Sequence, residues 1–169
     1  SAASDVYKRQ IVLGDIDGTW YWDNHLKWFV SNTKVIRNKK LILSLNGFYN
    51  LNDPENPLHY NARFERTPLL IAEEFGGEHI SNAKGYIDGN VKINGSFKNP
   101  SFDGKPMLHC QKIKVNYLQT AYRVNNELLF KGDSIIFDNF KLNDTKQQTK
   151  IHISGGLKPV SYTHLRAHE

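Results

Sequence analysis

The sequence has little of what marks several common protein classes. It contains one cysteine, Cys110, in 169 residues, which excludes an internal disulfide, and no Cys or His stands at metal-ligand spacing from it. No apolar run approaches the ~18 residues of a membrane-spanning helix. No N-terminal stretch has the charged, apolar and small-residue order of a signal peptide. We therefore expect neither an anchor nor a targeting signal in this stretch, and interpret Cys110 as a small hydrophobic residue in a strand.

The chain also lacks a dense charge cluster. It has 22 Lys and Arg against 17 Asp and Glu, a net charge of +5. The basic residues are spread evenly, which predicts solvated strand faces and protected edges. The alternative is affinity for an anionic surface, either nucleic acid or lipid headgroups. Because the aromatic residues mostly alternate in step with Ile, Leu and Val, as on a buried face, we predict no nucleic-acid partner.

The two ends differ from the middle of the chain. Residues 1–10 and 160–169 carry no periodicity that matches what they flank, and they resemble translations of sequencing-adapter DNA. We interpret both as artefact tails and base the fold prediction on residues 11–159.

The middle of the chain is dominated by alternation of apolar and polar residues. The runs around Leu43, Ala62, Ile93 and Val115 follow this period of two, which is typical of strands with one apolar and one polar face. Dipeptides that favour tight turns separate the runs. They are Asp23-Asn24, Asn46-Gly47, Asp88-Gly89, Asp103-Gly104, Asn125-Asn126 and Asn143-Asp144. Asn94-Gly95 lies inside an alternating run, so a bulge or bend is expected there.

One segment breaks the alternation. Thr67 fits a helix cap, Pro68 the first helical position and Gly76 the stop. We predict one short helix near 68–76, with Leu70 and Phe75 covering strand surface. It divides the chain into a first β part (11–66), a helix and loop (67–80) and a second β part (81–159).

An enzyme-like motif stands near the start of this region. The stretch IVLGDIDGT (11–19) resembles the first motif of haloacid-dehalogenase-like phosphatases, in which the first Asp, here Asp15, attacks phosphorus and the second, here Asp17, acts as acid and base beside Mg²⁺. That chemistry belongs to a parallel sheet with crossover helices. The residues after Thr19 alternate, turn and alternate again, so we predict no enzyme, and Asp15 and Asp17 are expected to be exposed strand residues. The histidines are dispersed, and we predict no metal site and no cofactor.

Four stretches, taken in order, resemble a known family. They are NAKGYIDGNVKINGSFKNPSFDG (82–104), IKVNYLQTAY (113–122), IIFDNFKLND (135–144) and IHISGGL (151–157). Their glycine, proline and tyrosine spacing is similar to that of the C-terminal region of TamB-like proteins of the AsmA-like superfamily (translocation and assembly modules), especially of the Bacteroidota type. Three upstream stretches, LGDI (13–16), WDN (22–24) and LNGFY (45–49), fit the preceding part of the same region.

The resemblance implies an architecture and a role. It implies a mainly-β, elongated, curled (taco-like) antiparallel or repeat sheet with an apolar concave side. The full-length proteins are anchored in the bacterial inner membrane, cross the periplasm, and are linked to phospholipid transport toward the outer membrane. They are also linked to outer-membrane protein assembly and secretion with a partner β-barrel. The expected partners here are therefore phospholipid acyl chains and such a barrel, with membrane contact through parts of the protein outside this stretch.

The apolar face of the second β part supplies the predicted lipid groove, since acyl chains gain roughly 0.8 kcal/mol per buried CH₂. The groove candidates are Val91, Ile93, Phe97, Ile113, Val115, Ile135, Phe137, Phe140, Leu142, Ile151 and Ile153. For each of them the alternative is an ordinary core contact. Two other functions remain as alternatives: a structural or adhesive β-solenoid with a closed, dry interior, and the phosphatase using Asp15 and Asp17.

Overall fold

The computed structural model describes residues 14–71, 80–115, 119–144 and 150–157. These form eleven strands and one 3₁₀ turn, η1 (Leu69–Ile71). The strands are β1 (Asp15–Asp23), β2 (Trp28–Arg37), β3 (Lys40–Asn50), β4 (Leu58–Pro68), β5 (Ile80–Gly95), β6 (Pro100–Gly104), β7 (Met107–Val115), β8 (Thr120–Glu127), β9 (Leu129–Gly132), β10 (Ser134–Asp144) and β11 (Lys150–Leu157).

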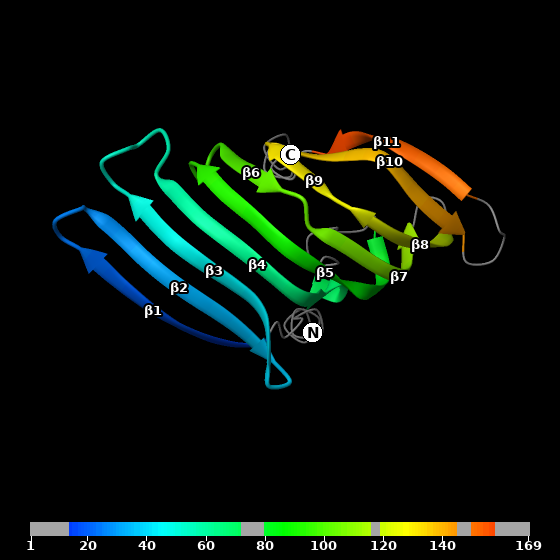
Figure 1. Cartoon of the computed structure of the whole chain (residues 1–169), viewed down its shortest axis with the longest axis horizontal. Helices are drawn as coiled ribbons and strands as arrows, with labels where there is room; N and C mark the ends of the chain where they lie inside the picture. Colours follow the sequence, from blue (N-terminus) through cyan, green and yellow to red (C-terminus); the bar gives the residue numbers. More distant parts are fainter. Residues whose placement is uncertain (1–13, 72–79, 116–118, 145–149, 158–169) are drawn as a thin grey trace, which may run out of the picture.

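All the strands belong to one open antiparallel sheet, in which neighbours in sequence are neighbours in space (Figure 1). The long strand β5 pairs with β6 through one half and with β7 through the other. In the same way β10 pairs with both β9 and β8. Thus β6 and β7 together occupy the place of one interrupted strand, and so do β8 and β9. With each of these pairs counted as one strand, the sheet is a simple meander. The pairing of β4 with β5 joins the two predicted β parts into this single sheet.

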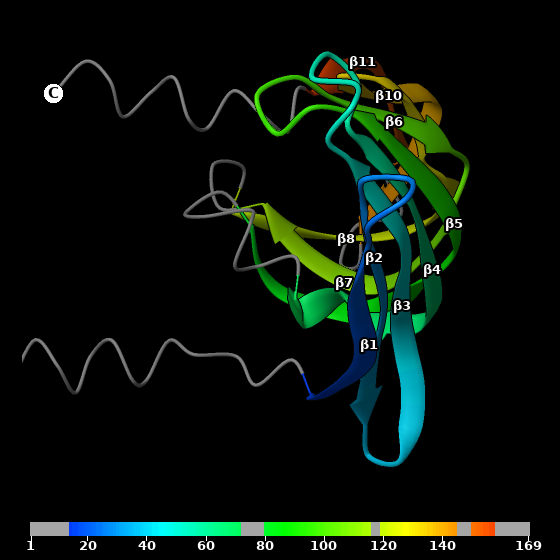
Figure 2. The same cartoon turned by 90° about the vertical axis from the view of Figure 1, so that its left-hand side faces the viewer.

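The sheet curls as predicted. In the view of Figure 2 the strands from β5 onward curve round in a C, and β1, β2 and β3 extend from it as a flatter wing. The mainly-β, curled antiparallel architecture is therefore confirmed. Among the described residues, no helix has the length and apolar character required to cross a membrane.

One face of the sheet carries almost all the buried apolar side chains. Residues paired across strands point to the same side, and the pairs Ala62–Val91 and Cys110–Val124 are buried. We call this side the inner face. Its most enclosed part is a cluster in which η1 contributes Leu69 beside residues of β5, β7 and β8: Leu69, Ala83, Cys110, Tyr122 and Val124. The opposite, outer face is mostly polar and exposed.

A line of irregularities crosses the sheet from β3 to β9. Ile42 is an extra residue in β3, and Glu65 and Arg66 face a single residue of β5. Pro106 then lies in the break between β6 and β7, and Leu128 lies in the break between β8 and β9. The Leu128 amide donates to the Pro106 carbonyl at 2.8 Å. These positions are adjacent in register, and we call the line the crease. Because bulges bend strands and increase their twist, the crease helps the sheet to curl.

Several predicted turns are strand residues instead. Asn46-Gly47, Asp88-Gly89 and Asn125-Asn126 all lie inside strands, because their residues pair with the neighbouring strands and the chain does not reverse there. The hairpin at Asp23-Asn24 is confirmed. A bulge or bend was expected at Asn94-Gly95, but the chain forms a hairpin there. Strand β5 ends at Gly95, and a turn leads directly into β6.

The predicted helix begins later than expected. Thr67 and Pro68 are the last residues of β4, and the buried Thr67 hydroxyl donates to the Ile42 carbonyl instead of capping a helix. A short 3₁₀ turn follows, and in it Leu69, not Leu70, is buried. Residues 72–79, which include Phe75 and Gly76, lie outside the described residues.

The thiol of Cys110 is expected to react slowly. Cys110 is 3% exposed, and burial raises the pKa of its thiol, although a hydrogen bond with the Lys112 backbone opposes the shift. Since the thiolate is the reactive form, alkylation at pH 8 should be roughly tenfold or more slower than in urea. Labelling followed by mass spectrometry measures this, and equal rates would show that the cluster opens freely. The same raised pKa means that this thiol contributes stability at lower pH that is lost as pH rises through its titration.

Candidate lipid-binding face

Four of the predicted groove residues belong to the inner face. Val91 is 3% exposed and Ile93 half-buried, and they pair with Ala62 and Tyr60 of β4. Ile113 is half-buried and packs against the enclosed cluster. Ile135 is half-buried and pairs with Phe130, which continues the row through Gly104 to Val91. The structure thus brings together, on one surface, residues that are far apart in the sequence.

Phe97 is placed differently from the prediction. It lies in the turn between β5 and β6, is 77% exposed, and stacks on Tyr49 with ring centroids 5.7 Å apart. The strand stops two residues earlier, at Gly95, where φ is 82° and the chain reverses. For the other candidates only the backbone pairing is described, and their side chains lie outside the described part of the structure. These are Val115, Phe137, Phe140, Leu142, Ile151 and Ile153.

The inner face of the wing exposes large apolar side chains that the groove prediction did not include. Ile16, Trp20 and Trp22 of β1 alternate onto this face beside Phe29 of β2. Their exposed fractions are 63%, 52%, 44% and 43%, respectively. The signal was in the sequence, as the alternation of Trp20 and Trp22 with Tyr21 and Asp23. Among the described residues no second layer packs on this part of the sheet.

The inner face therefore has two zones. At one end, η1 and the curled strands enclose the Leu69 cluster. At the other, aromatic rings of β1 and β2 face open space, and half-buried residues of β3 and β4 connect the zones. At ~3.3 Å per residue, the nine residues of β1 extend about 30 Å. This exceeds half of a bilayer's hydrocarbon core, ~15 Å, so an acyl chain fits along the wing.

Asp15 and Asp17 are not arranged as in the phosphatase family. Both are exposed in β1 and lie on the outer face, with Asp17 opposite Lys34. β1 pairs antiparallel with β2 along its whole length, so the parallel strand and crossover helix of that family are not found at this motif. Within the described ranges, no group of three or more His, Cys, Asp or Glu side chains is placed to hold a metal ion.

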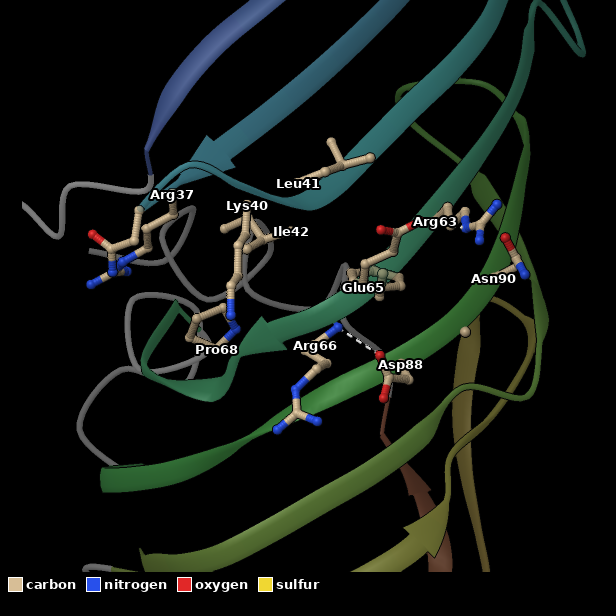
Figure 3. Close-up of a pocket in the computed structure, with 13 residues that line it drawn as sticks. Arg37, Lys40, Leu41, Ile42, Arg63, Glu65, Arg66, Pro68, Asp88 and Asn90 are labelled. Carbon is tan, nitrogen blue, oxygen red and sulfur yellow. Dashed lines mark hydrogen bonds and ion pairs between the residues drawn. The ribbon is translucent and has the colours of Figure 1, made fainter.

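A hollow of about 980 Å³ lies along the crease, where β3, β4 and β5 meet (Figure 3). Four basic side chains line it, together with two acidic ones. The basic residues are Arg37, Lys40, Arg63 and Arg66, and the acidic ones are Glu65 and Asp88. Arg63 follows the inward-facing Ala62, so it belongs to the outer face. Sequence reasoning missed these six charged residues as a group, because they come from four strands, β2 to β5, and meet around a bulge.

Comparison of the chain with protein-family models, with curated proteins and with solved structures yields no match.

Proposed function

We propose that the inner face binds phospholipid acyl chains and that the chain is a lipid-conducting, non-catalytic segment of a TamB-like protein of the bacterial envelope. The observation that carries the proposal is the exposed apolar row Ile16, Trp20 and Trp22 on a face that is continuous with the half-buried core. Exposed apolar surfaces of this kind mark interaction sites. The open antiparallel meander also favours a groove over the closed, dry interior of a solenoid.

The proposed setting follows from the same resemblance. In it the full-length protein is anchored in the inner membrane and spans the periplasm, and the curled sheet carries phospholipid toward the outer membrane. A role in outer-membrane protein assembly with a β-barrel partner belongs to the same proposal.

The test uses two neighbouring residues that face opposite sides. Trp20→Asp places a carboxylate on the inner face, whereas Tyr21→Asp places one on the outer face at nearly the same exposure, 54% against 52%. Losing the indole contact removes roughly 1–2 kcal/mol, about tenfold in affinity. We expect lipid that co-elutes with the full chain after incubation with phosphatidylethanolamine vesicles to fall in Trp20→Asp and to persist in Tyr21→Asp. Lipid is quantified by mass spectrometry.

Two results would contradict the proposal. One is an absence of co-eluting lipid with the unsubstituted chain. The other is an equal loss in both variants, which would indicate adsorption without a preferred face. Circular dichroism of the two variants verifies that each retains its sheet.

A further inference from the structure

We propose that the chain docks on the surface of a lipid bilayer through the tips of three hairpins, with Leu26, Leu51 and Phe97 inserted among the lipids. We call these three the tip residues. Docking goes beyond acyl-chain binding, because contact with a bilayer does not require the inner face to take up a lipid. Its basis is the exposure of the tip residues, their place at one end of the sheet, and the bonding of the backbone around them.

The three tips lie at the same end of the sheet. Because neighbouring strands run in opposite directions, the β1–β2, β3–β4 and β5–β6 connections (24–27, 51–57 and 96–99) form a row, seen along the upper left of Figure 1. Each carries one tip residue: Leu26 is 46% exposed, Leu51 57% and Phe97 77%. At ~4.8 Å between strands the row spans about 19 Å, so it matches an extended surface better than a single small molecule.

The polar backbone groups of the two leucine tips are bonded within the protein. The Leu26 amide donates to Asp23 Oδ1 at 2.9 Å, and the Leu26 carbonyl accepts from Asn52 Nδ2 at 2.8 Å. The Leu51 amide donates to the Lys27 carbonyl at 3.2 Å, which fixes the first two tips to each other. Since a polar group without a partner is costly in an apolar medium, these bonds lower the cost of placing the leucines in lipid.

The Phe97 tip joins this row to the inner face. Its turn is closed by two hydrogen bonds between Ser96 and Asn99, at 3.2 and 3.1 Å. The Phe97 ring stacks on Tyr49 of β3, and Tyr49 stands opposite Phe29 of β2 on the inner face. If the inner face binds acyl chains as proposed, the tips and that face form one continuous surface for lipid, which favours a bilayer over a protein as the occupant.

The charges of the three connections balance when histidine is neutral. Lys27 and Lys98 each follow the apolar residue of their tip. Asp53 and Glu55 lie in the β3–β4 connection. A lysine stem lies along apolar surface while its ammonium group stays in water. We therefore expect insertion of the apolar side chains to provide the affinity, so that a zwitterionic bilayer is sufficient.

Flotation of the full chain with phosphatidylcholine vesicles tests this contact. These vesicles are chosen because a chain with a net charge of +5 would adsorb on anionic ones without its tips. The variants are Leu51→Asp and Phe97→Asp. The control is Ile16→Asp, at a residue that is 63% exposed and lies at the opposite end of β1. Circular dichroism verifies that each variant retains its sheet.

We expect Leu51→Asp and Phe97→Asp each to weaken vesicle binding about tenfold and Ile16→Asp to change it less than about twofold. No flotation of the unsubstituted chain, or an equal loss in Ile16→Asp, would overturn the docking. Self-association that Phe97→Asp abolishes, without vesicle binding, would also overturn it and would assign the tips to a second copy of the chain. Flotation is measured separately from the lipid that co-elutes with Trp20→Asp, so either proposal can fail while the other stands.

A second measurement reports insertion itself. Because Cys110 is buried, Leu51→Cys provides one accessible thiol for a polarity-sensitive fluorophore. Its emission should shift to the blue when vesicles are added, whereas the same fluorophore on Asp17→Cys, an exposed position of the outer face, should not shift. Unshifted emission at position 51 would show that the tip stays in water and would overturn the proposal.

Discussion

Replacing Gly89 by alanine is expected to destabilise the chain by about 3 kcal/mol or more. Gly89 lies at the crease with φ of 130°, a region that is essentially closed to residues with a Cβ atom. A Cβ there would also stand 2.8 Å from Pro106 Cα. The contacted atom belongs to the backbone of Pro106, a fully buried residue between β6 and β7, so it cannot yield as the end of a flexible side chain would. Strain and overlap therefore act together.

Gly132→Ala is the matched control. Gly132 also has a positive φ, 61°, but no atom lies within 4 Å of the position that a Cβ would take. We expect a loss of about 1 kcal/mol, from backbone conformation alone. Urea unfolding followed by circular dichroism measures both values. If the two substitutions cost the same, close packing at the crease contributes nothing to stability.

Tyr122→Ala is expected to cost about 3–5 kcal/mol, the range for deleting a large side chain from a packed core. Tyr122 is 3% exposed and belongs to the cluster with Leu69, Ala83, Cys110 and Val124. Truncation leaves a cavity that the rigid ladders of β7 and β8 close only partly. It should also remove part of the packing around Leu69, the residue that holds η1 against the sheet.

The comparison for this prediction is Tyr21→Ala, at an exposed position of the outer face. It should change the free energy of unfolding by no more than about 0.5 kcal/mol. Both variants are measured by urea unfolding at one pH below the titration of Cys110, so that the thiol remains protonated. A small effect at Tyr122 would mean that the enclosed zone is loosely packed.

Alternation was sufficient to predict the fold class. Each strand buries one of its two faces, so apolar and polar residues alternate along it, as in the run that contains Val91 and Ile93. This alternation does not depend on which strand is the neighbour. The same reasoning could not locate Phe97, because the apolar rhythm continues for two residues after the strand has ended at Gly95. The chain reversal depends on backbone dihedral angles, which the pattern does not encode.

The turn dipeptides show a second limit. Asp23-Asn24 and Asp88-Gly89 both combine an aspartate with a residue that tolerates positive φ, so the sequence predicts a turn at each of them. The first is a hairpin, and the second lies within β5 beside the crease. Residues that tolerate unusual φ serve both purposes. Whether such a dipeptide forms a hairpin or stays inside a strand depends on the partner strand, and the pairing of strands is part of the tertiary structure.

The basic hollow was beyond sequence reasoning for a related reason. Arg37 and Lys40 are close in the chain, whereas Arg66 lines the same hollow only because β3 pairs with β4 and because Arg66 lies in a bulge. Charge counting treated all of these residues as solvated surface. The distinction between a solvated and an oriented cation appears only when partners such as Glu65 and Tyr86 are placed.

The sequential order of the meander has a consequence for assembly of the fold. Every strand finds its partner a short distance along the chain, so each hairpin closes a small loop, and the entropy of closure stays low. The sheet can then grow one hairpin at a time, each new strand using the last as its template. Stability in such a fold accumulates between nearest neighbours, as in repeat proteins. A local defect is therefore expected to weaken the pairings beside it more than those at the far edge.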